Sequence, residues 1–253
     1  MTPSVDKLLD LTGQCVLITG AAGTIGHATA ARLVEAGATV VLHHRTRSPD
    51  FESLLTTLGA KAIAVRADLT DADQINQMLD TIDSQKMTLT ALVNNAADQS
   101  VAGLADLSLE QWQHTTQTNL DAVFYLTQQA CARFPVTRVV NISSIEGSDG
   151  APGHGHYATS KAGVNMLTRS FALEYGGQNV RCNTISPGLV HRDGIEQSWP
   201  EGVQRWQQKA PLKRLGEGDD IADAALFLLS EASRWISGAN LVVDGGMSCQ
   251  TRW

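Results

Sequence analysis

The clearest structural signal in the chain is the stretch CVLITGAAGTIG at positions 15–26. Its continuous apolar start is typical of a β-strand that is buried on both faces of a sheet. Glycines follow the strand, and apolar residues at helical spacing then continue as far as Gly37. A glycine-rich turn between a strand and a helix lets the backbone approach a pyrophosphate, whose charge the free N–H groups of the helix attract. The stretch therefore predicts a dinucleotide site with contacts from Gly20, Gly23, Thr24, Ile25 and Gly26.

Short β-rich segments alternate with helical segments along the rest of the chain. Further strands are predicted at residues 39–42, 62–65, 91–93, 138–142, 180–185 and 239–243. Helices are predicted at 24–37, 71–84, 109–134 and 156–175, and Ser48 with Pro49 marks another helix start. Long helices between strands imply right-handed crossovers and a mostly parallel sheet. We therefore predict a doubly wound α/β Rossmann fold with a mostly parallel seven-stranded sheet, in a single domain over residues 1–253. The buried stripe expected on the helix at 109–134 comprises Leu120, Val123, Phe124, Ala130, Cys131 and Phe134.

The composition argues against several classes of protein. The 253 residues are 43% hydrophobic and only 18% charged, which is typical of a compact globular chain. A formal charge of −7 without any Lys/Arg-rich run argues against nucleic-acid binding, and no apolar run approaches the ~18 residues of a membrane span. The N-terminus lacks the features of a signal peptide, and the cysteines lie far apart without CxxC pairs, so we expect a cytoplasmic protein with free thiols. No metal site is predicted, because the histidine-containing loops lack zinc spacing.

The end of the second predicted strand bears on the choice of nucleotide. An acidic residue at this point hydrogen-bonds the adenosine ribose of NAD, whereas a basic residue accommodates the 2′-phosphate of NADP. The sequence here is His43-His44-Arg45, and no carboxylate follows until Asp50. We expect His44 and Arg45 to contact the cofactor, with Arg45 as the phosphate ligand. The hypothesis is NADP(H) in preference to NAD(H); the alternative is a solvated arginine on a loop.

A phenol and an ammonium group stand four residues apart in the helix predicted at 156–175. Tyr157 and Lys161 therefore share one face of that helix. A free tyrosine titrates near pH 10, and a neighbouring cation lowers the pKa of the phenol toward the range where it can exchange protons. Ser144, at the end of the strand predicted at 138–142, could hydrogen-bond a carbonyl oxygen. The alternative is a surface tyrosine beside a solvated lysine.

Together these motifs resemble the short-chain dehydrogenase/reductase family, and the resemblance extends from Leu11 to Gly246. Segments at 68–69, 94–97 and 187–188 match the family after the third, fourth and sixth strands. The resemblance implies a catalytic tetrad of Asn119, Ser144, Tyr157 and Lys161. It also implies cofactor contacts from Asp68, Leu69, Asn95, Ala96, Tyr157, Lys161, Pro187 and Gly188.

The family resemblance implies hydride transfer between a nicotinamide and a carbonyl or carbinol carbon. In reduction, Ser144 would polarise the carbonyl oxygen and Tyr157 would protonate it. Lys161 would lower the pKa of the phenol and hold the nicotinamide ribose, while Asn119 would support a water that passes protons to Lys161. The resemblance also suggests a homotetramer, with the helices at 109–134 and 156–175 and the last strand at its interfaces.

The chain departs from the family pattern at three points. Thr24 stands where the family usually has glycine, and Ala97 replaces the glycine of the segment at 94–97. The segment at 189–193 lacks the threonine that often contacts the nicotinamide carboxamide. We therefore assign no carboxamide contact.

Two polar segments are expected to contact the substrate. A substrate flap is expected over residues 189–210, which carry many polar side chains, and Glu146, His154 and His156 lie in the other expected substrate loop. Such polarity suits a sugar, polyol or acidic carbonyl compound, although a flap that meets water is normally polar. The alternative to an NADP(H)-preferring enzyme is an NAD-dependent sugar or polyol dehydrogenase. A non-catalytic nicotinamide-binding redox sensor is a further alternative, against which the intact tetrad argues.

Overall fold

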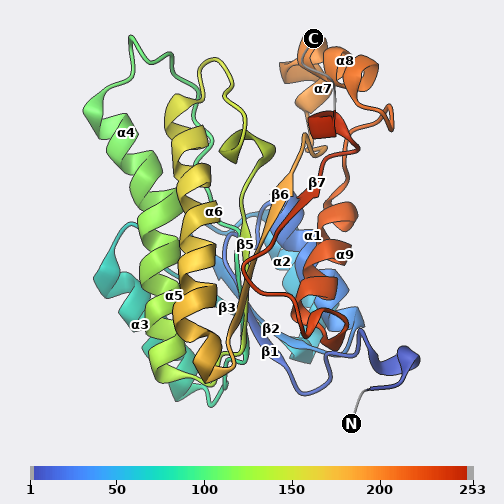
Figure 1. The fold of residues 1–253 in the computed structure, drawn as a ribbon. Helices are drawn as coiled ribbons and strands as arrows, with labels where there is room; N and C mark the ends of the chain where they lie inside the picture. The colour runs from blue at the N-terminus through green and yellow to red at the C-terminus, as the bar shows by residue number, and fades with distance from the viewer. Residues whose placement is uncertain (1–2, 250–253) are drawn as a thin grey trace.

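The fold is built on one sheet of seven parallel strands, in a computed structural model that describes residues 3–249 (Figure 1). The two ends of the predicted domain, residues 1–2 and 250–253, lie outside the described residues. The strand order is β3-β2-β1-β4-β5-β6-β7, which confirms the predicted doubly wound topology. The strands are β1 (Cys15–Ile18), β2 (Thr39–His44), β3 (Ala62–Arg66), β4 (Ala91–Asn94), β5 (Arg138–Ile142), β6 (Arg181–Pro187) and β7 (Asn240–Val243).

Helices cover both faces of the sheet (Figure 1). One layer consists of α1 (Thr24–Glu35), α2 (Pro49–Leu58) and α9 (Gly218–Leu229). The other consists of α3 (Ala72–Ser84), α4 (Leu109–Thr116), α5 (Ala122–Arg133) and α6 (Gly155–Tyr175). Two short helices, α7 (Ile195–Ser198) and α8 (Pro200–Lys209), follow β6 in the predicted flap.

Strand β1 shows why the apolar run at its start is continuous. All four of its residues are buried. Val16 and Ile18 pack into the core beneath α1, α2 and α9, while Leu17 packs into the core on the α3 and α5 side. Because successive side chains of a strand point to opposite faces, a strand covered on both sides needs an apolar residue at every position.

The helix predicted at 109–134 is interrupted by a π-helical segment, Gln117–Asp121, between α4 and α5. A π turn holds an extra residue, so the side chains beyond it are rotated relative to an uninterrupted α-helix. Phe124 was expected in the buried stripe but is 43% exposed, whereas Val123 and Ala130 are buried as predicted. The prediction that Phe124 lies on the buried face was therefore wrong, because it assumed a regular helical period across this segment.

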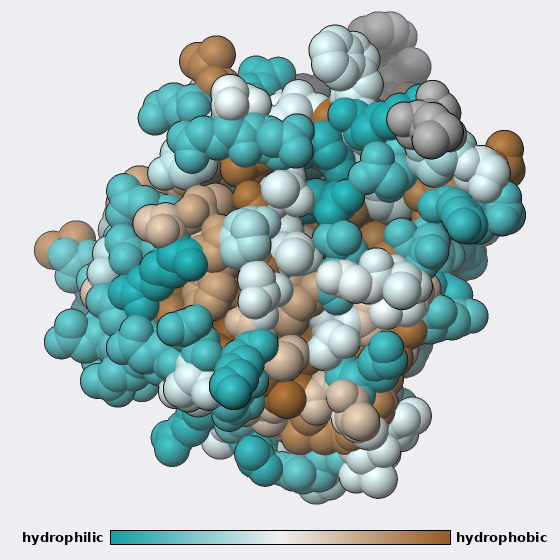
Figure 2. Space-filling view, turned by 90° about the horizontal axis from the view of Figure 1, so that it is seen from below, coloured by the Kyte–Doolittle hydropathy of each residue, from teal (hydrophilic) through white to brown (hydrophobic). Residues whose placement is uncertain are grey.

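The carboxyl ends of the strands point toward the end of the molecule that carries α7 and α8 (Figure 1). The opposite end shows mostly polar residues around a central group of hydrophobic ones (Figure 2). Within residues 3–249, no helix is both long and apolar enough to cross a membrane.

Candidate active site

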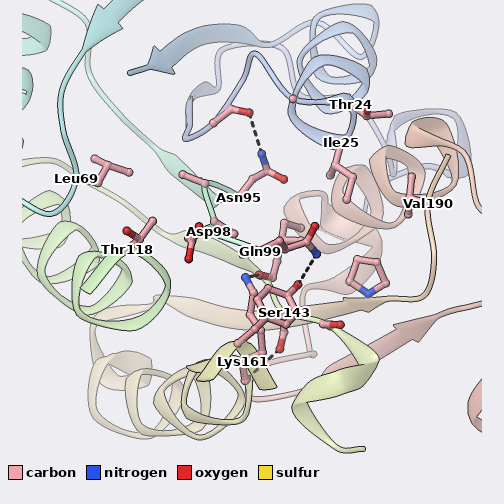
Figure 3. A pocket seen from close by; sticks show the side chains of 18 of the residues that line it. Thr24, Ile25, Leu69, Asn95, Asp98, Gln99, Thr118, Ser143, Lys161 and Val190 are labelled. Carbon is pink, nitrogen blue, oxygen red and sulfur yellow. Dashed lines mark hydrogen bonds between the residues drawn. The ribbon is translucent and has the colours of Figure 1, made fainter. Parts of the chain in front are cut away.

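A cleft of about 480 Å³ opens at the carboxyl ends of the strands (Figure 3). Its walls come from the turn after β1, from the ends of β2 to β6 and from the start of the flap. This is the place where open α/β sheets bind ligands, and the volume is in the range of small-molecule sites. The predicted site residues that line it are Gly20, Gly23, Thr24, Ile25, Arg45, Asp68, Leu69, Asn95, Ala96, Ser144, Tyr157, Lys161, Pro187 and Gly188.

The glycines of the turn have different structural roles. Gly20 has φ +64°, and a Cβ on it would lie 2.8 Å from the Cα of Ala96. A Cβ on Gly26 would lie 2.8 Å from the Cα of Ala21 and would also meet the carbonyl of Gly20. Gly26 is buried in the turn, so it allows close packing and does not line the cleft. A Cβ on Gly23 would meet nothing closer than 3.6 Å.

The turn fits the pyrophosphate of a dinucleotide. Helix α1 begins at Thr24, and no side chain caps its N-terminus. The first N–H groups of a helix have no intrahelical partner, so those at Thr24 and Ile25 can bind an anion in the cleft. Thr24 is exposed and lines the cleft together with Gly20, Gly23 and Ile25.

The two histidines at the end of β2 lie on opposite faces of the sheet. His44 was predicted to contact the cofactor, but its ring is buried against Phe51 of α2, with 4.8 Å between the ring centroids. His43 instead lines the cleft. Because side chains alternate along a strand, only one of two successive histidines can reach the site.

His43 links the glycine-rich turn to the end of β3. Its Nδ1 accepts a hydrogen bond of 3.2 Å from the backbone N–H of Gly20, and its Nε2 lies 3.1 Å from the carbonyl oxygen of Ala67. The first contact needs an unprotonated Nδ1 and the second needs a proton on Nε2, so the imidazole ring is neutral. Burial lowers the pKa of His43 to about 4, which agrees with this state. No motif in the sequence indicates this role.

Arg45 and Asp68 line the cleft just beyond the ends of β2 and β3. Arg45 is exposed. The carboxylate of Asp68 accepts hydrogen bonds from the hydroxyl and the N–H of Thr70 at 2.7 and 2.9 Å, and these bonds lower its pKa. The cleft therefore combines a charged carboxylate and a guanidinium, and the positive charge of Arg45 also favours the ionised form of Asp68.

Tyr157 and Lys161 of α6 also line the cleft, and Tyr157 lies within hydrogen-bonding distance of Ser144. The phenol oxygen of Tyr157 accepts a hydrogen bond of 2.9 Å from Nε2 of Gln99, a residue that no sequence motif had indicated. Lys161 is buried, and its Nζ donates a hydrogen bond of 2.8 Å to the carbonyl oxygen of Ile142. The ammonium lies 5.6 Å from the centroid of the tyrosine ring.

Burial controls the protonation of both groups. It raises the pKa of the Tyr157 phenol, and hydrogen bonds from Gln99 and Ser144 act in the opposite direction without cancelling it. Burial lowers the pKa of Lys161 to about 8. We expected Lys161 to lower the pKa of Tyr157, but the net direction in this structure is upward because desolvation of the phenol is the larger effect.

Asn119 is buried in the π-helical segment and does not line the cleft. Its Oδ1 accepts a hydrogen bond of 2.7 Å from the N–H of Asp98. Its Nδ2 donates to the carbonyl of Asp98 at 2.9 Å and to Oγ of Ser160 at 3.0 Å. The side chain therefore fixes the loop after β4 against α6.

Comparison with known proteins agrees with this geometry. A family model described as enoyl-(acyl carrier protein) reductase matches residues 20–248. The chain is 32% identical over 248 residues to glucose 1-dehydrogenase 2 of Bacillus subtilis, and the alignment covers 94% of this chain and 96% of that protein. It is 33% identical over 243 residues to 3-oxoacyl-[acyl-carrier-protein] reductase FabG of Thermotoga maritima, with coverage of 94% and 98%. The chain belongs to the short-chain dehydrogenase/reductase family.

A solved structure supports the same assignment. It is that of a provisionally named gluconate dehydrogenase from Agrobacterium tumefaciens, with a TM-score of 0.89, 29% identity and coverage of 96% of this chain and 99% of that one. As a short-chain dehydrogenase/reductase, the protein is an NAD(P)-dependent oxidoreductase that transfers hydride between the nicotinamide and a CH–OH or C=O group. The predicted family and reaction class are confirmed.

The polar residues expected to meet the substrate of this short-chain dehydrogenase/reductase separate into two groups. His191 and Arg192 line the cleft at the start of the flap. Glu146 and His154 instead form a half-buried pair, with 2.8 Å between Oε2 and Nδ1, and the His154 ring packs edge-on against Tyr157. His156 is buried. In the part of the chain that the structure describes, no three His, Cys, Asp or Glu side chains converge as a metal site would require.

Proposed function

We propose that the protein is an NADP(H)-preferring oxidoreductase of small polar carbonyl or alcohol compounds, in which Asn119, Ser144, Tyr157 and Lys161 serve the reaction. The observation that carries the proposal is that Ser144, Tyr157 and Lys161 line the same cleft as the glycine-rich turn after β1. A dinucleotide that spans this cleft has its nicotinamide end beside the tyrosine.

Ser144 and Tyr157 act on the oxygen of the substrate. When bound, the nucleotide supplies the hydride in reduction or accepts it in oxidation. The Ser144 hydroxyl donates a hydrogen bond to the substrate oxygen, and the Tyr157 phenol gives its proton to that oxygen in reduction. In oxidation the phenolate takes the proton from the alcohol. Tyr157 is buried, so little water competes with the substrate for the phenol oxygen.

Lys161, in the cleft wall, and Asn119, buried behind it, support this proton transfer. A cationic Lys161, 5.6 Å from the ring of Tyr157, stabilises the phenolate that forms during reduction. Because burial lowers the pKa of Lys161 to about 8, this support weakens as the pH rises through that value. Asn119 positions the backbone of Asp98 and the helix that bears Tyr157.

The preference for NADP(H) is proposed from Arg45. The side chain is exposed at the cleft, and none of the described carboxylates forms a salt bridge with it. The neighbouring Arg47, in contrast, is paired with Glu52 at 2.9 Å. An exposed guanidinium without a salt bridge is a suitable ligand for the 2′-phosphate. The turn at Gly20 to Ile25 would hold the pyrophosphate, and Lys161 would hold the nicotinamide ribose.

We also propose one domain over residues 1–253, with residues 189–210 as the substrate flap, and assembly into a homotetramer. Several large hydrophobic side chains of the outer helices and the edge strand are exposed: Phe124, Met166, Leu173, Leu241 and Val242. Such side chains favour contact with other subunits. Light scattering at micromolar concentration should give the mass of four chains; a monomer would contradict the assembly. The free thiols of all four cysteines favour the cytoplasm.

Replacement of Tyr157 by phenylalanine tests the proposed chemistry. Tyr157→Phe should bind NADPH like the wild type and lose at least about 100-fold in kcat, because general acid–base catalysis contributes at least that much. Tyr175→Phe, on the same helix but with its ring packed against Phe171, is the matched control and should keep its rate. A Tyr157→Phe enzyme with kcat within threefold of the wild type would refute the assignment.

A further inference from the structure

Gln99 lies between the catalytic tyrosine and the open cleft. It follows β4, lines the cleft and has an exposed side chain. Its Nε2 donates a hydrogen bond of 2.9 Å to the phenol oxygen of Tyr157 (Figure 3). The phenol oxygen is the atom that the proposed function places against the reacting oxygen of the substrate. Gln99 is therefore in reach of the atoms next to the reacting carbon.

The backbone just before Gln99 is firmly held. Both the N–H and the carbonyl of Asp98 are bonded to the amide of Asn119. The Asp98 carboxylate accepts hydrogen bonds from Thr115 at 2.5 Å and from Ser100 at 2.8 Å. The base of the Gln99 side chain is thus fixed, and its amide is held by the hydrogen bond to Tyr157. An amide held at both points can discriminate between substrates.

The orientation of the Gln99 amide leaves an acceptor in the cleft. Nε2 is engaged by Tyr157, and none of the described residues donates a hydrogen bond to Oε1. The two atoms of one amide are only about 2.3 Å apart, so Oε1 stays beside the phenol oxygen. In a vicinal diol or an α-hydroxy ketone, the second oxygen is likewise held beside the reacting oxygen. Its hydroxyl can donate to Oε1 while the reacting oxygen meets Tyr157.

We propose that Gln99 is a specificity-determining residue that selects substrates carrying a hydroxyl group on the carbon next to the reacting carbon. The proposal rests on the proposed function, because that function places the substrate oxygen at Tyr157. The hydrogen bond from Gln99 to Tyr157 is the same whichever substrate is bound, so it does not select between substrates. Only the contact at Oε1 distinguishes a hydroxylated substrate from its simple analogue.

The test compares two pairs of small compounds with the wild-type enzyme and Gln99→Met, a variant of similar length without an amide. Acetoin and butanone are compared as substrates by kcat/KM. Butane-2,3-diol and butan-2-ol are compared by Kd for the enzyme saturated with NADPH, through the fluorescence of the bound nucleotide. Gln178→Met, at an exposed position after α6, is the matched control.

For the wild type we expect the hydroxylated member of each pair to be favoured about tenfold, the value of one hydrogen bond. In Gln99→Met both ratios should fall to within twofold of unity, and in Gln178→Met they should stay as in the wild type. The proposal would be overturned if the wild type bound the diol and the simple alcohol equally well. It would also be overturned if the ratio of the two Kd values were the same in Gln99→Met as in the wild type. Both outcomes can be read even if neither ketone is reduced. Turnover that survives Tyr157→Phe would instead count against the proposed function.

Discussion

The backbone N–H of Gly20 donates a hydrogen bond of 3.2 Å to Nδ1 of His43. This bond joins the turn that would hold a pyrophosphate to the second strand of the sheet, and it requires a neutral imidazole. On the other side of the ring, Nε2 lies 3.1 Å from the carbonyl oxygen of Ala67. A proton on Nδ1 would point at the N–H of Gly20, and the hydrogen bond between the two residues would be lost.

The stability of the protein should therefore depend on the protonation of His43. Below pH 6.5 the unfolded chain takes up a proton at this residue, whereas the native state does not until the pH approaches about 4. The free energy of unfolding should fall across this window, by about 2 kcal/mol between pH 7.5 and pH 5 from this residue alone. His43→Asn keeps an acceptor for Gly20 and removes the titration. Urea unfolding at the two pH values should show a loss about 2 kcal/mol smaller in this variant than in the wild type.

His114→Asn, at an exposed position of α4, controls for the loss of a histidine as such. Its loss of stability between the two pH values should equal that of the wild type. The same loss in His43→Asn as in the wild type would mean that His43 is protonated in the native state.

The second prediction concerns the choice of nucleotide. Arg45→Ser should raise the Kd for NADPH about ten- to hundredfold, because a hydrogen-bonded contact with a charged phosphate is lost. The Kd for NADH should change less than about threefold, since NADH carries no 2′-phosphate. Both constants can be measured by fluorescence titration through energy transfer from the five tryptophans.

Arg47→Ser is the control for Arg45, because Arg47 is paired with Glu52 and does not line the cleft. It should leave both dissociation constants within about threefold of the wild type. An equal loss of NADPH and NADH binding in Arg45→Ser would contradict a specific phosphate contact. Tighter binding of NADH than NADPH by the wild type would favour an NAD-dependent sugar or polyol dehydrogenase.

The architecture could be predicted because a parallel sheet covered on both faces demands continuous apolar strands. Each of the seven strands lies within two residues of its predicted bounds, and Ser48 caps α2 as expected, accepting a hydrogen bond from the N–H of Phe51. Helix α9 was not identified, although Ile221, Ala225 and Leu229 are buried at helical spacing. That signal was available in the sequence.

The contacts within the site could be predicted only where a motif fixes them. At the end of β2 a difference of one position reverses the face of the sheet, so the sequence could not show that His43 and not His44 reaches the cleft. Gln99 lies on a loop without a motif, and its contact with Tyr157 exists only because the fold brings that loop against α6. The upward direction of the Tyr157 pKa depends on burial, which the sequence does not specify.

The last prediction separates two glycines of the same turn. Gly26→Ala should destabilise the protein by about 3 kcal/mol, since its Cβ would meet Nδ2 of Asn95 at 2.9 Å as well as the backbone of Gly20 and Ala21. Asn95 could not move aside easily, because Nδ2 donates to the carbonyl oxygens of Thr19 and Gly20, each at 3.0 Å.

Gly23→Ala is the matched comparison, because a Cβ at this position would meet nothing closer than 3.6 Å. It should cost less than about 1 kcal/mol, the difference between glycine and alanine at a helix N-cap. In thermal unfolding the Tm should fall by roughly 5–10 °C for Gly26→Ala and by less than about 3 °C for Gly23→Ala. An equal fall in Tm in the two variants would mean that the turn can rearrange to accept a Cβ at position 26. Close packing would then not explain the glycine at this position.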